Sequence, residues 1–142
     1  LDGPLFFGSA DAIRREFRRI EREYPSQTHL VFNIRGVGQI DLAAAELLIE
    51  EARRRKARGG ALYVQTKIPR TIRQLQQFHV VEHLGGQTVH LYKGDAISYA
   101  ISQLDRQICD SCSARIWFDC PPDPHAKAGV AEASAPQQST HV

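Results

Sequence analysis

The sequence lacks any predominantly apolar stretch of about 18 residues, so it contains no segment long enough to cross a membrane as a helix. It also lacks a charged leader with an apolar centre and a small-residue cleavage site, so nothing marks it for secretion. Leu1 stands where a methionine would begin a complete protein, and we expect the chain to be cut from a longer one. Its 142 residues, 42% of them apolar, can bury the core of one domain.

Cysteine is scarce, with three residues that all lie between positions 109 and 120. This odd number does not form a disulfide framework and fits a reducing cytosol better. Cys109 and Cys112 have a zinc-like spacing, whereas Cys120 and His125 follow at a looser one. A second closely spaced pair would make this signal specific. We therefore predict no cofactor and no metal, and keep a small zinc-binding or redox module built on these four residues as an alternative.

The net charge of +2 hides an asymmetry along the chain. Residues 1–108 carry 16 Lys and Arg against 12 Asp and Glu, a net of +4, and residues 109–142 carry 2 against 4, a net of −2. The basic charge therefore belongs to the part that we expect to fold. No aromatic residues are interleaved with the basic run at 53–58, so we predict no nucleic-acid partner.

Strand-like and helix-like segments alternate along the first 108 residues. The expected strands lie at residues 5–7, 29–34, 61–65 and 88–92, and the expected helices begin after Ser9, after Asp41, at Pro69 and at Gly94. This alternation predicts an α/β fold, in which crossover helices pack on a sheet. We divide the chain into a folded domain at 1–108, a cysteine-containing extension at 109–121 and a tail at 122–142. The tail has almost no large apolar residues, so we expect it to be disordered.

Apolar residues at helical spacing predict the buried faces of these helices. The expected stripes are Ile13, Phe17, Ile20 and Tyr24 in the first helix, Ile72, Leu75 and Phe78 in the third, and Ile97, Ala100, Ile101, Leu104 and Ile108 in the last.

Asp41 is the most informative single residue, because it stands between a buried strand and a long helix. The first N–H groups of a helix have no partner within it, so the Asp41 carboxylate can cap them. An anion site at the same turn is disfavoured, because Asp41 places a negative charge where a phosphate would bind and no glycine-rich loop with a following lysine is present. No nucleophile and base are paired anywhere in the sequence, so we predict that the protein is not an enzyme.

Several segments resemble the STAS domain of bacterial SulP-type anion transporters, the sulfate permease family. They occur in the same order as in that family, at residues 3–10, 31–41, 75–81, 95–97 and 109–120. His79 stands where glycine is common in the family, and residues 114–120 read ARIWFDC, similar to the ARIF-x-EC tail of some bacterial members. The resemblance covers about residues 1–121. No single segment is very specific, but five in the right order are.

The resemblance implies a four- to five-stranded mixed β-sheet with about four helices packed mainly on one face. It implies that a strand preceding residue 5 is missing or truncated. It also implies a regulatory and interaction domain, C-terminal to the membrane-spanning part of a sulfate, bicarbonate or dicarboxylate transporter, on the cytoplasmic face of the inner membrane. As an isolated domain it would be soluble. The first alternative is a free-standing partner-switching protein of the anti-sigma antagonist class.

In that second class, the aspartate at the start of the helix is followed by a phosphorylatable serine. Here residues 42–45 are Leu-Ala-Ala-Ala, so no hydroxyl is present to accept a phosphoryl group. We therefore expect non-covalent docking at this turn. The residues that we predict to form the docking turn are Gln39, Ile40, Asp41, Leu42 and Ala44.

Two basic helical faces are the remaining candidates for contact with a partner. They comprise Arg14, Arg18 and Arg22 in the first helix and Arg53, Arg54 and Arg55 near the end of the second. A solvated surface explains them equally well, because cations are favoured near a helix C-terminus. If they do bind, we expect the membrane-spanning part of the parent transporter, an acidic cytosolic protein such as an acyl carrier protein, or an anionic lipid surface.

Overall fold

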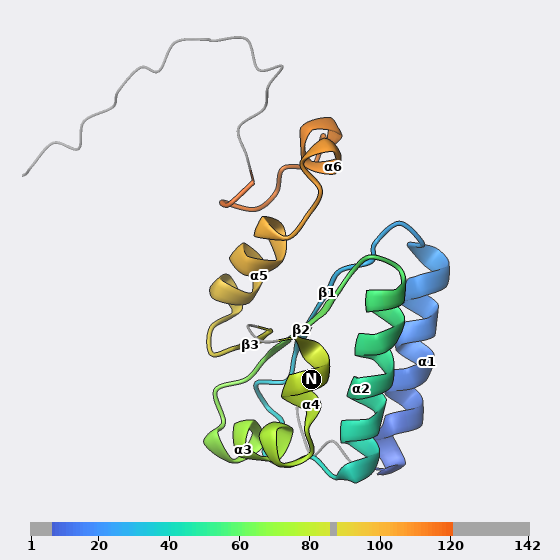
Figure 1. Cartoon of the computed structure of the whole chain (residues 1–142), viewed down its shortest axis with the longest axis vertical. Coiled ribbons are helices and arrows are strands. Elements are labelled where there is room, and N and C mark those ends of the chain that lie inside the picture. The colour runs from blue at the N-terminus through green and yellow to red at the C-terminus, as the bar shows by residue number, and fades with distance from the viewer. Residues whose placement is uncertain (1–6, 86–87, 121–142) are drawn as a thin grey trace, which may run out of the picture. The chain divides into compact units, whose positions relative to one another are not determined.

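The computed structural model describes residues 7–85 and 88–120, and the chain divides into two compact units, residues 1–104 and 105–142. Nine helices and strands follow one another along the described residues (Figure 1). They are α1 (Phe7–Glu23), β1 (Leu30–Asn33), α2 (Leu42–Ala57), β2 (Leu62–Gln65), α3 (Pro69–Gln77), α4 (Val80–Leu84), β3 (Val89–His90), α5 (Lys93–Ser102) and α6 (Arg106–Ser111). The first eight belong to the first unit, and the expected α/β fold class is confirmed.

The sheet of the first unit contains three strands among the described residues, in the order β1-β2-β3, and all of them are parallel. The expected four or five strands of mixed direction are therefore too many for this part of the chain. The expected strand at 88–92 is also too long, because only Val89 and His90 pair with β2. Of the expected strand at 5–7, residues 5 and 6 lie outside the described residues, and α1 already begins at Phe7, which places Ser9 inside the helix.

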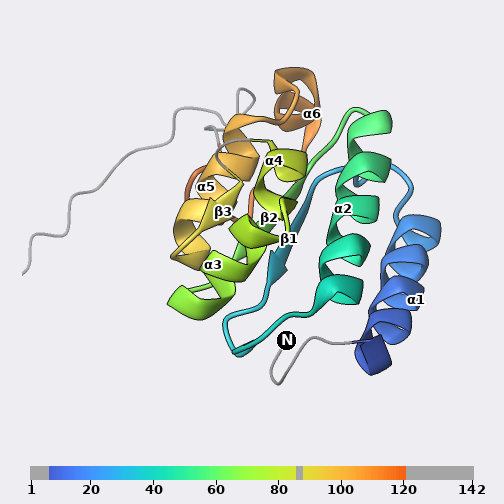
Figure 2. The same ribbon diagram turned by 60° about the horizontal axis from the view of Figure 1, so that its bottom comes forward.

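The two faces of the sheet are covered by different helices. Leu62 and Val64 of β2 belong to the main hydrophobic core, which contains residues of α1, α2, α3 and α4. The alternate residues Tyr63 and Gln65 point the other way, and the Tyr63 ring meets Tyr99 of α5 edge-on at 5.9 Å. Figure 2 shows α2 and α5 on opposite sides of the strands. Most helices therefore lie on one face, as expected.

The first helix packs along α2 in both views (Figures 1 and 2). Ile13 and Phe17 are buried, and Phe17 contacts Phe32 of β1 edge-on at 5.2 Å. Tyr24 was expected to continue this buried stripe, but it lies just after the end of α1 and is 50% exposed.

Two glycines end α2 and turn the chain into β2. Gly59 has a φ of +75°, which favours a residue without a Cβ atom. At Gly60, an added Cβ would lie 2.2 Å from the carbonyl oxygen of Thr28, so only glycine lets the two chain segments approach this closely. The N–H of Gly60 donates to the carbonyl oxygen of Arg55 at 2.9 Å.

The expected last helix is two separate helices. α5 ends at Ser102, and α6 begins at Arg106 in the second unit, where the side chain of Asp105 caps the N–H of Gln107 at 2.9 Å. Ile108 is 59% exposed and is not part of a buried stripe with Ala100. The predicted disordered tail at 122–142 lies outside the described residues. No helix in the described ranges has both the length and the hydropathy that a membrane crossing needs.

Candidate functional site

The turn between β1 and α2 is held from below by two buried apolar side chains. Val37 and Ile40 are 0% and 1% exposed, and the intervening Gly38 and Gln39 face solvent. The chain therefore leaves β1, returns to the core twice and enters α2 in a fixed position.

Helix α3 fixes the same turn through two polar side chains. The Thr71 hydroxyl donates to the carbonyl oxygen of Val37 at 2.5 Å. The Gln74 amide contacts both backbone groups of Ile40, accepting from its N–H at 3.1 Å and donating to its carbonyl oxygen at 3.0 Å. These two residues were missed in the sequence, where only the apolar face of α3 was considered. Thr71 and Gln74 lie three residues apart, about one helical turn, in the helix that begins at Pro69. That spacing places them on one face and was the available signal.

Asp41 caps α2 as predicted. Its backbone is extended, and its Oδ1 atom accepts from the N–H of Ala44 at 2.9 Å. The carbonyl oxygen of Asp41 also accepts from the N–H of Ala45 at 3.0 Å. The carboxylate therefore stabilises the first turn of the helix.

The predicted docking turn is only partly accessible. Gln39 is exposed, Leu42 is 58% exposed and Asp41 is intermediate. Ile40 and Ala44 are buried and cannot contact a partner, because their side chains fill the core beneath the turn. The accessible part is therefore a polar residue and a large apolar residue on either side of the capping aspartate.

The predicted basic faces are largely neutralised by carboxylates from the same two helices. Arg18 lies 2.7 Å from Glu50 across the α1–α2 contact, and Arg14 lies 3.4 Å from the same carboxylate. Arg54 pairs with Glu21 in the opposite direction. Arg22 is exposed, and the described residues give it no ion pair within 4.0 Å.

Arg55 does not belong to a contact face at all, because its side chain is only 2% exposed. Its Nε donates to Glu51 at 2.7 Å, and its Nη1 donates to the carbonyl oxygen of Thr28 at 3.1 Å. Burial raises the pKa of Glu51, and the charges of Arg55 and Arg18 partly offset that rise. Arg55 therefore holds the loop before β1 against α2.

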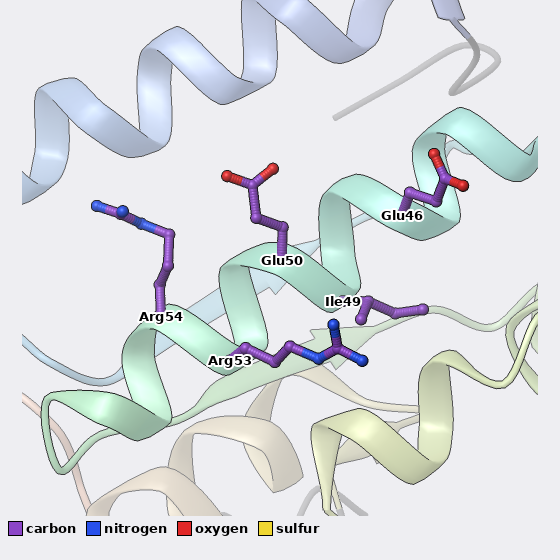
Figure 3. Close-up of a pocket in the computed structure, with 5 residues that line it drawn as sticks. All are labelled: Glu46, Ile49, Glu50, Arg53 and Arg54. Atoms are coloured by element: carbon purple, nitrogen blue, oxygen red, sulfur yellow. The ribbon is translucent and has the colours of Figure 1, made fainter.

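An open hollow of about 410 Å³ runs along the outer side of α2. Its lining residues are Glu46, Ile49, Glu50, Arg53 and Arg54, all from this one helix (Figure 3). Figure 3 shows Glu50 and Arg54 extending toward α1, which agrees with their ion pairs to that helix. Arg53 extends the other way, and its Nη2 atom lies 3.5 Å from Nε2 of His83 in α4. Among the described residues that line it, the hollow brings together no nucleophile and base.

The cysteines of the second unit differ in exposure. Cys109 is buried, Cys112 is exposed and Cys120 is intermediate. Hydrogen bonds from the N–H groups of Arg115 and Ala114 lower the pKa of the Cys112 thiol. Within residues 7–85 and 88–120, no three His, Cys, Asp or Glu side chains come together in a group that could hold a metal ion. His125, the fourth residue of the zinc alternative, lies outside these ranges.

The family model of the STAS domain matches residues 1–94. No curated protein sequence matches the chain. The crystal structure of a sulfate transporter family protein from Wolinella succinogenes is similar, with a TM-score of 0.63 and 29% identity over 72% of this chain and 82% of that chain. This neighbour supports the SulP-type branch that the sequence motifs indicated. The chain thus belongs to the STAS domain family.

Proposed function

We propose that this STAS domain is the cytoplasmic regulatory and interaction domain of a SulP-type secondary anion transporter. The transported anion would belong to the sulfate, bicarbonate or dicarboxylate class. Similarity to a sulfate transporter family protein supports this assignment. The domain would act on the membrane-spanning part of its own parent protein, and it would not be an enzyme.

The observation that carries the mechanism is the exposed Leu42 at the rigid start of α2. An apolar side chain that is 58% exposed on a fixed turn can be buried by a partner with little loss of conformational entropy. The turn is fixed by the Asp41 cap and by the Gln74 amide, so its shape is set before a partner arrives. Docking at Gln39 and Leu42 would therefore be a preorganised apolar and polar contact.

Covalent switching at the same place is disfavoured by chemistry. Residues 42–45 contain no hydroxyl, so a kinase would find no acceptor at the start of α2. The free-standing partner-switching alternative depends on such an acceptor. An acidic cytosolic partner, such as an acyl carrier protein, would meet only the exposed cations of α1 and α2 that form no ion pair in the described structure, which are Arg15, Arg22, Arg53 and Lys56.

The test is the effect of Leu42→Glu on anion transport by the complete parent protein. We expect uptake of radiolabelled sulfate or bicarbonate into membrane vesicles to change severalfold, because a charge replaces the apolar contact of the turn. Tyr24→Glu is the matched control, since Tyr24 is 50% exposed at the far end of α1 and lies outside the turn. Equal transport by the wild type and both variants would contradict docking through this turn.

A further inference from the structure

The ends of β2 and β3 place a second group of basic and apolar side chains together. Lys67 and Arg70 follow β2, and Leu91, Tyr92 and Lys93 follow β3. All five residues are exposed, with Leu91 at 50% and Tyr92 at 58%. We call these five residues the carboxyl-edge patch, because they lie where the parallel strands end.

Hydrogen bonds hold the two segments of the patch side by side. The N–H of Thr66 donates to the carbonyl oxygen of His90 at 3.0 Å, and the buried Gln65 amide donates to the carbonyl oxygen of Leu91 at 2.7 Å. The ammonium group of Lys67 then lies 5.0 Å from the centre of the Tyr92 ring. The patch is therefore one surface built from the two segments that follow β2 and β3.

The positive charge of this surface is not neutralised by an ion pair with any described residue. Between residues 59 and 94 the sequence has four Lys and Arg residues and a single acidic residue, Glu82, whose carboxylate lies 3.1 Å from Nδ1 of His79. In the described part of the chain, no carboxylate lies within 4.0 Å of the charged groups of Lys67, Arg70 or Lys93. Asp95, in the first turn of α5, is the nearest acidic residue in the sequence. The N-terminal dipole ends of α3 and α5 add to the positive potential.

The chemistry of the patch fits the surface of an anionic bilayer. Leucine and tyrosine side chains insert at the level of the lipid headgroups, with the tyrosine hydroxyl kept in water. Lysine and arginine beside them are attracted to negatively charged headgroups. An acidic protein could pair with the basic side chains, but its charges alone would not account for the exposed apolar residues Leu91 and Tyr92 beside them.

We propose that the carboxyl-edge patch binds the surface of an anionic membrane through Lys67, Arg70 and Lys93, with Leu91 and Tyr92 entering the headgroup region. This goes beyond the proposed function, because it requires neither the parent transporter nor the turn at Leu42. It also moves the anion-attracting surface away from α1 and α2, whose arginines are mostly paired.

The experiment is co-sedimentation of the full 142-residue chain with vesicles of equal parts phosphatidylglycerol and phosphatidylcholine at low salt. Each basic residue near an anionic surface raises partitioning about fivefold, so the variant K67E/R70E/K93E should partition at least about 100-fold less. L91S/Y92S should also bind less, and about 1 M salt should release the wild type because the Debye length falls to about 3 Å.

The matched control is R15E/R22E/K56E, which makes the same charge change at exposed residues for which the described structure shows no ion pair. It should keep most of the binding, and circular dichroism should show both triple variants folded. Several results would overturn the proposal. The first is a wild type that does not co-sediment with anionic vesicles, and the second is an equal loss of vesicle binding in both triple variants. The third is a loss of vesicle binding when only the exposed residues Ile116 and Phe118 are changed to serine. Binding to polyglutamate with none to vesicles would assign the patch to an acidic protein instead.

Discussion

Helices α1 and α2, which together form the α1–α2 layer, and the carboxyl-edge patch both carry basic side chains but use them differently. In the layer, Arg18 and Arg54 reach across to carboxylates on the opposite helix, so the charges join the two helices. In the patch, Lys67 and Lys93 have no such carboxylate among the described residues. The density of basic residues is therefore a poor guide to a binding surface, and the pairing of each charge is a better one.

The largest expected effect comes from the buried centre of the layer. Arg55→Met removes the hydrogen-bonded partner of Glu51 in a site that is almost closed to water and leaves only Arg18, 3.8 Å away, beside that carboxylate. We therefore expect a loss of about 3 kcal/mol in the free energy of unfolding, the lower end of the cost of breaking a buried pair. Urea denaturation measures this. Burial already raises the pKa of Glu51, so the variant should recover stability as the pH falls and Glu51 becomes neutral.

The double variant R55M/E51L serves as its control. It removes both charges together and should be more stable than R55M alone, because no unpaired charge remains buried. A single variant as stable as the wild type would mean that the buried pair does not hold the layer together.

A smaller loss of stability is expected on removing the Asp41 cap at the start of α2. Asp41→Ala removes the acceptor of the Ala44 N–H and should cost about 1 kcal/mol, whereas Asp41→Asn keeps an acceptor and should cost only a few tenths. Thermal unfolding of both variants checks the difference. Equal melting temperatures for Ala and Asn would show that the cap contributes nothing to stability.

The smallest expected loss of stability comes from weakening an exposed ion pair of the α1–α2 layer, and it can be compared with a matched change in the carboxyl-edge patch. Glu21→Gln weakens the contacts of one carboxylate with Arg54 and with Arg58, which lies 3.0 Å away, and should cost at most about 1 kcal/mol at low salt. That cost should shrink as salt is added. The matched variant in the patch, K67Q/R70Q/K93Q, should change stability by no more than about 0.5 kcal/mol, because its residues are exposed and form no ion pair in the described structure.

Chemical denaturation at two salt concentrations distinguishes the two surfaces. A patch variant that lost more stability than Glu21→Gln would show that the patch supports the fold, and its charges would then not be free for a partner.

Features set by neighbouring residues could be predicted from the sequence. The helix 42–57 was expected within a residue of its observed end, because Asp41 and Gly59 are local signals at its two boundaries. The strand expected at 29–34 is observed at 30–33, because an apolar run that ends at a polar residue is also a local signal.

Features that depend on distant residues could not be predicted in this way. Gln74 contacts Ile40 across 34 residues of sequence, and Arg18 meets Glu50 across 32. The extent of β3 depends on which residues face Val64 and Gln65 of β2, and periodicity within 88–92 contains no information on that register. Four of the six arginines that were predicted to form a contact surface therefore pair with carboxylates of α1 and α2. They are Arg14, Arg18, Arg54 and the buried Arg55.

The Gln74 amide has a consequence for how changes spread through this domain. It satisfies the N–H and the carbonyl oxygen of Ile40 together, as the backbone of a neighbouring β-strand would. A side chain of α3 thus acts as a substitute strand for the chain that leads into α2. If α3 moved, Gln74 would therefore pull on Ile40 and shift Leu42, which lies two residues further along the chain. A change in the position of α3 would then alter the exposed surface at the start of α2.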